Sequence, residues 1–129
     1  MRIRKGTSHL CYRKIAVALC LLTALSAIPG HAVTASFMAT VERTLVADED
    51  RWGGCMVYTN VTLSDLGLDC RGRWVTFSCS GVHTTKDVAY RMFDSAQMAM
   101  ALTKPVRLYV SDQKKHNDYC YANRIDVLK

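Results

Sequence analysis

The stretch TTKDVAYRMFDSAQMAMALTKPVRLYVS (residues 84–111) decides the fold, because its hydrophobic period changes partway along. Between residues 88 and 100, apolar side chains recur at three- and four-residue intervals, which predicts one face of a helix. Thr84 or Thr85 is suited to cap that helix. Pro105 cannot continue it, so we expect the helix to end near residues 103–104 and an alternating strand to follow. The predicted core face consists of Val88, Met92, Ala96, Ala99 and Met100.

Strand-like segments lie on both sides of this helix. They alternate in polarity or are rich in β-branched and aromatic residues, as half-buried strands are. Only Arg43 is out of phase in the first segment. The five predicted strands are residues 37–47, 55–62, 73–80, 105–111 and 119–128, with polar loops at 48–54, 63–72 and 112–118.

The resulting order, β-β-β-α-β-β, is that of an OB-fold, a five-stranded and partly open Greek-key barrel. The sequence therefore predicts a mainly β domain with one helix, whose Val88, Met92 and Ala96 face plugs the open end of the barrel. An open α+β sheet with the same string of elements stays as the alternative fold.

The N-terminus has the pattern of a signal peptide. Residues 1–14 carry five bases and no acid, residues 15–28 carry no charge, and small residues follow the Pro29-Gly30 break. Cleavage after Ala32 or after Ala35 satisfies the small-x-small rule, so we expect a segment 1–35 and a single domain 36–129. The apolar run is shorter than the roughly 20 residues that span a bilayer, so no stable membrane insertion is expected.

The net charge of the predicted domain does not favour a nucleic-acid partner. The chain has 17 Lys and Arg, 11 Asp and Glu, and a net charge of +6. Removing residues 1–35 leaves 12 bases and 11 acids, so the predicted domain is nearly neutral. A nucleic-acid-binding domain needs clustered excess base. No nucleic-acid partner is expected.

Four cysteines remain after the predicted signal segment, and in an exported domain they indicate two disulfides rather than a metal site. If the second and third strands form a hairpin centred near Gly67, Cys55 and Cys79 lie opposite each other. In the OB topology the last strand runs parallel beside the third, which brings Cys70 and Cys120 to one barrel end. We predict Cys55–Cys79 and Cys70–Cys120, with a bulge near Asn123 in the last strand.

The segment AQMAMALTKPVRLY (residues 96–109) resembles the helix-into-strand region of the B subunits of AB5 toxins, in the subtilase-cytotoxin and pertussis-like branch. In that branch a helix also runs into a Pro/Ser-Val-Arg strand. The resemblance covers this segment and the order of elements. It implies a pentameric, glycan-binding subunit. None of that family's sugar-contacting residues can be placed on this chain.

No catalytic motif is visible: the sequence lacks G-x-S-x-G, H-E-x-x-H and a phosphate-binding glycine loop. His83 and His116 are each able to act as a base, but neither has a partner that the sequence reveals. Asp65 and Asp69 form a carboxylate pair in a loop where such residues usually serve turns. We expect no catalytic residue, no metal site and no cofactor.

Binding is the remaining prediction, and OB-folds bind oligosaccharides on the strand 2–3 face and adjoining loops. Trp52 lies in one such loop, where it either stacks on a sugar or folds back as a lid over the barrel mouth. A second loop offers cations to an anionic ligand. The outer strand face presents aromatic and amide side chains that serve either a ligand or a subunit interface. The predicted ligand-binding residues are Trp52, Tyr58, Asn60, Trp74, Lys114, Lys115 and His116.

These features together predict a secreted or periplasmic, non-enzymatic binding module that contacts a glycan or an exported protein and is able to form a homo-oligomer. The main alternative is a small exported inhibitor or immunity protein that blocks a partner enzyme. A minor hydrolase is a third hypothesis. Residues 60–62 (Asn-Val-Thr) also match the N-glycosylation acceptor pattern.

Overall fold

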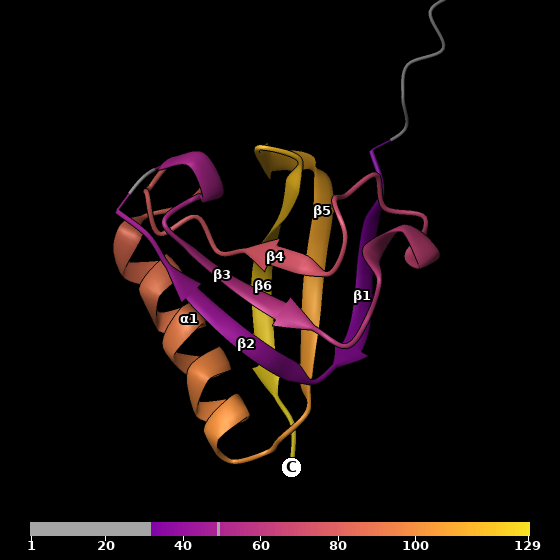
Figure 1. The fold of residues 1–129 in the computed structure, drawn as a ribbon, viewed down its shortest axis with the longest axis vertical. Helices are drawn as coiled ribbons and strands as arrows, with labels where there is room; N and C mark the ends of the chain where they lie inside the picture. Colours follow the sequence, from indigo (N-terminus) through magenta and orange to yellow (C-terminus); the bar gives the residue numbers. More distant parts are fainter. Residues whose placement is uncertain (1–31, 49) are drawn as a thin grey trace, which may run out of the picture.

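The computed structural model describes residues 32–48 and 50–129, so most of the predicted signal segment lies outside the described residues. Six strands, one helix and two short 3-10 helices make up the described part (Figure 1). Their order is β1 (Thr34–Ala39), β2 (Val41–Val46), η1 (Asp50–Trp52), β3 (Cys55–Thr59), η2 (Leu63–Leu66), β4 (Trp74–Thr76), α1 (Lys86–Ala101), β5 (Val106–His116) and β6 (Tyr119–Val127).

The strands form one mixed sheet in the order β1-β5-β6-β4-β3-β2. The β4–β6 pair is parallel, as predicted for the third and last strands, and the other pairs are antiparallel. The mainly β class with one helix is confirmed. The five-stranded barrel is not, because the sheet has six strands and no ladder joins β1 to β2 among the described residues. Within the same residues, no helix has the length and apolar character needed to cross a membrane.

The first predicted strand is in fact two. Thr40 separates β1 from β2, and Asn60 fixes this corner: its Oδ1 accepts a hydrogen bond from the Thr40 amide at 2.8 Å, and its own amide donates to the Thr40 carbonyl at 3.2 Å. A bulge between Val41 and Arg43 then shifts the β2–β3 register. That bulge explains why Arg43 breaks the alternation of the sequence.

Helix α1 begins and ends close to the predicted residues. Thr85 is its N-cap, with Oγ1 accepting a hydrogen bond from the Val88 amide at 3.5 Å. The predicted buried face is confirmed at Met92, Ala96 and Ala99 and wrong at Val88, which is 46% exposed. The helix packs on β2, β3 and β6. The buried face consists of Ala89, Met92, Phe93, Ala96 and Ala99.

Both predicted disulfides are present. Cys55–Cys79 has a Cα–Cα distance of 5.4 Å and Cys70–Cys120 one of 5.5 Å. The β3–β4 register from which we predicted Cys55–Cys79 is wrong by two residues, because Val57 pairs with Val75. Cys79 still reaches Cys55 because β4 ends at residue 76. Two disulfides are typical of proteins that work in an oxidising compartment outside the cytosol.

The predicted polar loop at residues 112–118 is wrong. Strand β5 continues to His116, and β6 begins at Tyr119, so a two-residue turn joins them. Asn117 and Asp118 both have positive φ, 50° and 69°, which is the conformation of the tight hairpin turns that Asn and Asp favour. The bulge predicted near Asn123 is confirmed: Tyr109 pairs with Arg124 and Val110 with Ala122, leaving Asn123 as the extra residue.

Strand β3 is buried on both faces. Cys55, Val57 and Thr59 point into the core between sheet and helix, and none of them is exposed. Met56 points to the opposite face, yet only 2% of it is exposed. A second layer of side chains must therefore cover the outer face of the sheet at this point.

Candidate functional site

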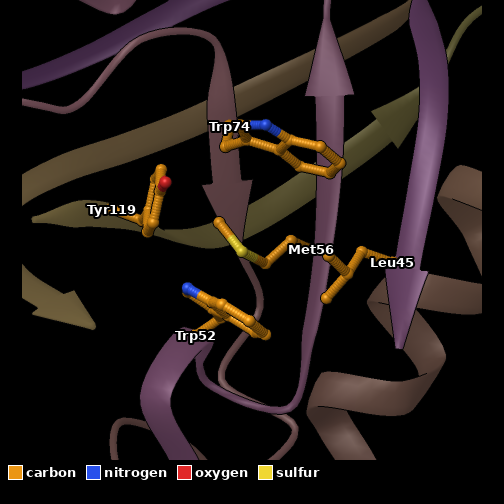
Figure 2. A pocket seen from close by; sticks show the side chains of 5 residues that line it. All are labelled: Leu45, Trp52, Met56, Trp74 and Tyr119. Atoms are coloured by element: carbon orange, nitrogen blue, oxygen red, sulfur yellow. The ribbon is translucent and has the colours of Figure 1, made fainter. Parts of the chain in front are cut away.

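An aromatic pocket lies on the outer face of β3, above Met56 (Figure 2). It has a volume of about 150 Å³. Met56 lies between the two indoles, and Tyr119 closes one side. The lining residues are Leu45, Trp52, Met56, Trp74 and Tyr119.

The sheet register explains why these residues converge. Leu45 of β2 lies directly opposite Met56 of β3. The parallel pairing of Val75 with Cys120 makes the preceding residues, Trp74 and Tyr119, neighbours across β4 and β6. Because side chains alternate between the two faces of each strand, all four point to the outer face.

Trp52 reaches the pocket from η1 through a turn that depends on glycine. Gly53 has φ +77°, and a Cβ there would lie 2.7 Å from Cδ2 of His116 and would collide with Oγ1 of Thr76. That same hydroxyl donates to the Trp52 carbonyl at 3.0 Å and to the Cys55 carbonyl at 3.2 Å. The turn is thus anchored to β4, and the half-buried indole is held over Met56.

Guanidinium groups lie close to the pocket's aromatic rings. Arg51 lies 5.3 Å from the Trp52 ring centroid, Arg71 lies 5.7 Å from that of Tyr119, and Arg43 lies 5.7 Å from that of Trp74. These distances fall within the range of cation–π attraction. Arg43, Arg51 and Arg71 are exposed, so three cationic side chains beside the pocket's rings are open to solvent.

Tyr58 extends the aromatic surface away from the pocket. Its ring lies 5.0 Å from that of Trp74, and Arg43 and Arg73 lie 4.4 and 4.2 Å from its centroid. Nε of Arg73 donates to the Tyr58 hydroxyl at 2.8 Å, and Arg73 also pairs with Glu42 at 3.6 Å. Arg73 is therefore already engaged, whereas none of the ion pairs among the described residues includes Arg43.

The remaining predicted site residues lie elsewhere. Asn60 uses its side-chain oxygen to hold the β1–β2 corner. Lys114 is exposed on β5, with Nζ 5.9 Å from the ring centroid of Tyr121. Lys115 pairs with Asp69 at 2.7 Å. None of these three lines the aromatic pocket.

His116 was predicted as a ligand-binding residue in the polar loop 112–118, but it is the last residue of β5 and is buried beneath the Trp52 turn. Its Nε2 lies 2.9 Å from the Ser78 hydroxyl, and the His83 ring lies 4.5 Å away. Burial, and secondarily the neighbouring His83, lower the pKa of His116 below its ordinary value, while a hydrogen bond to the Asp50 backbone opposes the shift. The neutral imidazole is therefore the favoured form in the fold.

The contact between Ser78 and His116 has the reach of a nucleophile and its base. Ser78, however, has no exposed surface, and its hydroxyl also accepts a hydrogen bond from the His83 amide at 3.0 Å. The pair thus serves as a buried polar link between the segment after β4 and the end of β5. Among the described residues, no cluster of His, Cys, Asp or Glu has the geometry to hold a metal ion.

Sequence reasoning found the two tryptophans of the pocket and missed its other lining residues. Leu45 and Met56 appeared as ordinary strand residues, and Tyr119 as the start of the last strand. The arginines were also missed. Arg71, Arg73 and Trp74 stand within four consecutive positions, which is a signal that a search for interleaved basic and aromatic residues would have found.

Comparisons of this chain with protein-family models, with curated proteins and with solved structures found no match.

Proposed function

We propose that this chain is an exported, non-enzymatic binding module, and that its ligand is a glycan held on the aromatic pocket. The observation that carries the proposal is the exposed pocket walled by Trp52, Trp74 and Tyr119. Aromatic faces stack on the apolar face of a sugar ring, and their polar edges accept or donate hydrogen bonds. The two disulfides and the N-terminal signal pattern support work outside the cytosol.

The size and charge of the pocket narrow the ligand class. About 150 Å³ is below the usual range for drug-sized ligands, so the pocket suits one sugar residue or one substituent of a longer chain. The rim carries Arg43, Arg51 and Arg71, which favour a glycan with carboxylate or sulfate groups.

We propose in addition that the domain is an OB-like fold. If β1 and β2 are counted as one strand bent at Thr40, the chain has five strands with the helix between the third and fourth. The pocket then lies on β3 and β4, the second and third strands of that scheme, where OB-folds bind oligosaccharides. The resemblance to AB5 toxin B subunits also implies self-association, which light scattering of the exported protein measures directly.

A protein partner is the second candidate. Tryptophan, tyrosine and arginine dominate the energetic centres of protein interfaces, and the pocket region is rich in all three. An exported inhibitor or immunity protein would use the same surface to block an enzyme.

The test compares the oxidised, exported protein with two variants on a glycan array and in a pull-down of exported proteins. Trp52→Ala removes a pocket wall. Tyr109→Ala is the matched control, because Tyr109 also has a guanidinium stacked on it, Arg124 at 4.7 Å, but does not line the pocket. We expect array binding that Trp52→Ala weakens by about 1–3 kcal/mol with little change in Tm, and that Tyr109→Ala leaves unchanged.

Loss of array binding in both variants, or a large fall in Tm for Trp52→Ala with intact affinity, would contradict the proposal. In the second case Trp52 would be a lid over the sheet rather than a ligand contact. An empty array combined with specific capture of one exported enzyme would favour the inhibitor instead.

A further inference from the structure

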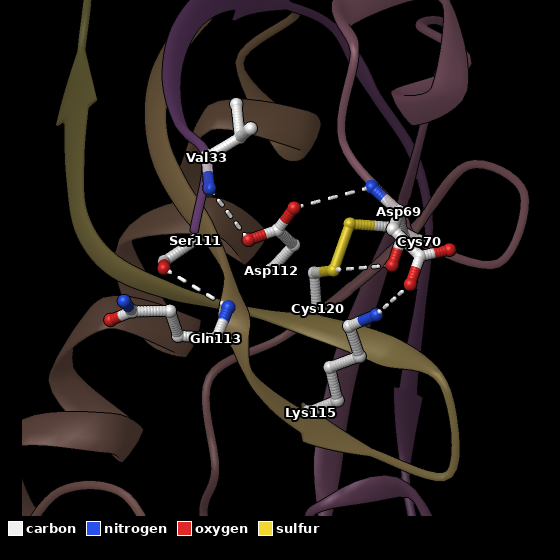
Figure 3. The surroundings of a disulfide bond; sticks show 8 residues. All are labelled: Val33, Asp69, Cys70, Ser111, Asp112, Gln113, Lys115 and Cys120. Atoms are coloured by element: carbon white, nitrogen blue, oxygen red, sulfur yellow. Dashed lines mark hydrogen bonds and ion pairs between the residues drawn. A yellow bond between two sulfur atoms is a disulfide. The ribbon is translucent and has the colours of Figure 1, made fainter. Parts of the chain in front are cut away.

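Asp112 holds the backbone of Val33 at both of its polar atoms. The Val33 amide donates to Oδ1 of Asp112 at 2.8 Å (Figure 3). The Asp112 amide donates to the Val33 carbonyl at 3.1 Å. The second carboxylate oxygen, Oδ2, accepts a long hydrogen bond from the Asp69 amide at 3.5 Å. One side chain thus ties the start of β1 to the loop that carries the Cys70–Cys120 disulfide.

The charge of Asp112 is not balanced by a side chain in the described part of the protein. The ion pairs there involve Glu42, Asp69, Asp87 and Asp126, and none includes Asp112. Of the two lysines on the same hairpin, Lys115 pairs with Asp69, and Lys114 has its Nζ 5.9 Å from the ring centroid of Tyr121. Asp112 is half-buried, so its carboxylate has lost part of its hydration while receiving only neutral amide donors.

The position of Val33 coincides with one of the two small-x-small cleavage sites. Cleavage after Ala32 makes Val33 the first residue and keeps every bond described above. Cleavage after Ala35 removes Val33, together with Thr34 and Ala35, which pair with Ser111 and Val110. The second cut would shorten β1 by two of its six residues.

We propose that the chain is processed by hydrolysis of the Ala32–Val33 peptide bond, and that the new N-terminal ammonium of Val33 forms an ion pair with Asp112. A signal peptidase adds one water across the bond: the hydroxyl goes to the Ala32 carbonyl carbon, which becomes a carboxylate. The Val33 nitrogen gains hydrogen and becomes an amine that is largely protonated at pH 7.

Processing changes the strength of the contact without moving its atoms. Before cleavage the Val33 nitrogen is a neutral amide with one hydrogen. After cleavage it carries a positive charge and three hydrogens beside a carboxylate oxygen that is already 2.8 Å away. Charge-assisted hydrogen bonds are roughly twice as strong as neutral ones. Removal of the signal segment therefore strengthens the contact that holds the start of β1 to the loop carrying the Cys70–Cys120 disulfide. This effect does not depend on what the aromatic pocket binds.

The first measurement is the N-terminus of the full chain after export into a bacterial periplasm, determined by intact mass and N-terminal sequencing. The proposal expects Val33 as the first residue. A first residue of Ser36, or a chain that retains residues 1–32, would overturn it.

The second measurement tests the ion pair in the exported protein. Asp112→Asn should raise the equilibrium constant of unfolding about fivefold at pH 7, where the amine is charged. The effect should shrink at pH 9.5, where the amine is neutral. Asp118→Asn is the matched control, since it removes an exposed charge from the same hairpin and leaves Val33 untouched. Equal losses at the two pH values would show that Asp112 is only a neutral acceptor and would refute the ion pair.

A measurement on the unmutated protein covers the case in which Asp112→Asn does not fold. With ¹⁵N-valine labelling, the titration of the Val33 α-amine is followed directly by NMR. An ion pair with Asp112 holds the pKa of this amine above that of an unpaired N-terminal valine. A midpoint at or below the unpaired value would refute the pair.

Discussion

Gly53 gives the sharpest test of how the pocket is built. Replacing it with alanine adds one methyl group at a turn with φ +77°. The methyl would lie 2.7 Å from Cδ2 of His116 and would collide with Oγ1 of Thr76. Both neighbours are buried, so neither can simply move aside into solvent. The substitution therefore imposes a backbone penalty and a packing penalty together.

The two penalties have separate magnitudes. An alanine in the left-handed region costs about 1–2 kcal/mol. Overpacking by one methyl group against fixed neighbours costs about 1–3 kcal/mol more. Gly67→Ala isolates the backbone penalty, because Gly67 has φ +76° and nothing lies within 4 Å of the position that its Cβ would take. We expect Gly53→Ala to destabilise the fold by about 2–5 kcal/mol and Gly67→Ala by about 1–2 kcal/mol.

Urea unfolding of the oxidised protein, followed by circular dichroism, measures both variants. Near-ultraviolet spectra report in addition whether the environment of Trp52 has changed, and only Gly53→Ala should alter them. Equal losses of stability in the two variants would refute the reasoning, because they would mean that the space around Gly53 is not filled by His116 and Thr76.

Two further predictions concern stability. Replacing Cys70 and Cys120 by serine should cost up to about 4 kcal/mol, and replacing Cys55 and Cys79 up to about 3.5 kcal/mol, since their sequence separations are 50 and 24; urea unfolding that ranks the pairs in the opposite order would contradict this. Because the pKa of His116 is lowered in the fold, stability should be complete above the ordinary value near 6.5 and fall as the pH drops from there toward the folded pKa. Thermal unfolding should show this slope in the wild type and a smaller one in His116→Gln, and an unchanged slope in the variant would refute the assignment.

Local signals in the sequence were sufficient to predict the helix and its N-terminal cap. Pro105 and the change of period at residue 105 act on the backbone nearby, and the structure ends α1 at Ala101. The disulfide pairing also followed from topology. The buried helix face followed in part: Met92, Ala96 and Ala99 are buried as predicted. Val88 and Ala89 satisfy the same spacing, and only packing against β2, β3 and β6 decides between them.

Long-range contacts decided the features that were predicted wrongly. The corner at Thr40 is fixed by Asn60, 20 positions away, and the polarity pattern around residue 40 carries no trace of it. The polar segment 112–118 looked like a loop because the strands there are partly exposed. The Asn117-Asp118 pair was a usable signal, since both residues tolerate the positive φ of a two-residue hairpin turn.

The sequence indicated only part of the pocket, because long-range contacts bring its lining residues together. Trp52 and Trp74 stood out as aromatic residues in polar surroundings. Their convergence with Met56 and Tyr119 depends on the register between three strands, which a single sequence does not encode locally.

We propose that a glycan contacts the pocket between Trp52 and Trp74, which are the two tryptophans of the whole chain. Their indole N–H groups give two resolved signals in a ¹⁵N-labelled sample. Titration with the glycan that binds best on the array should shift both signals with one common Kd and leave the Tyr109 amide unmoved. Saturable glycan binding that leaves both indole signals in place would contradict the claim.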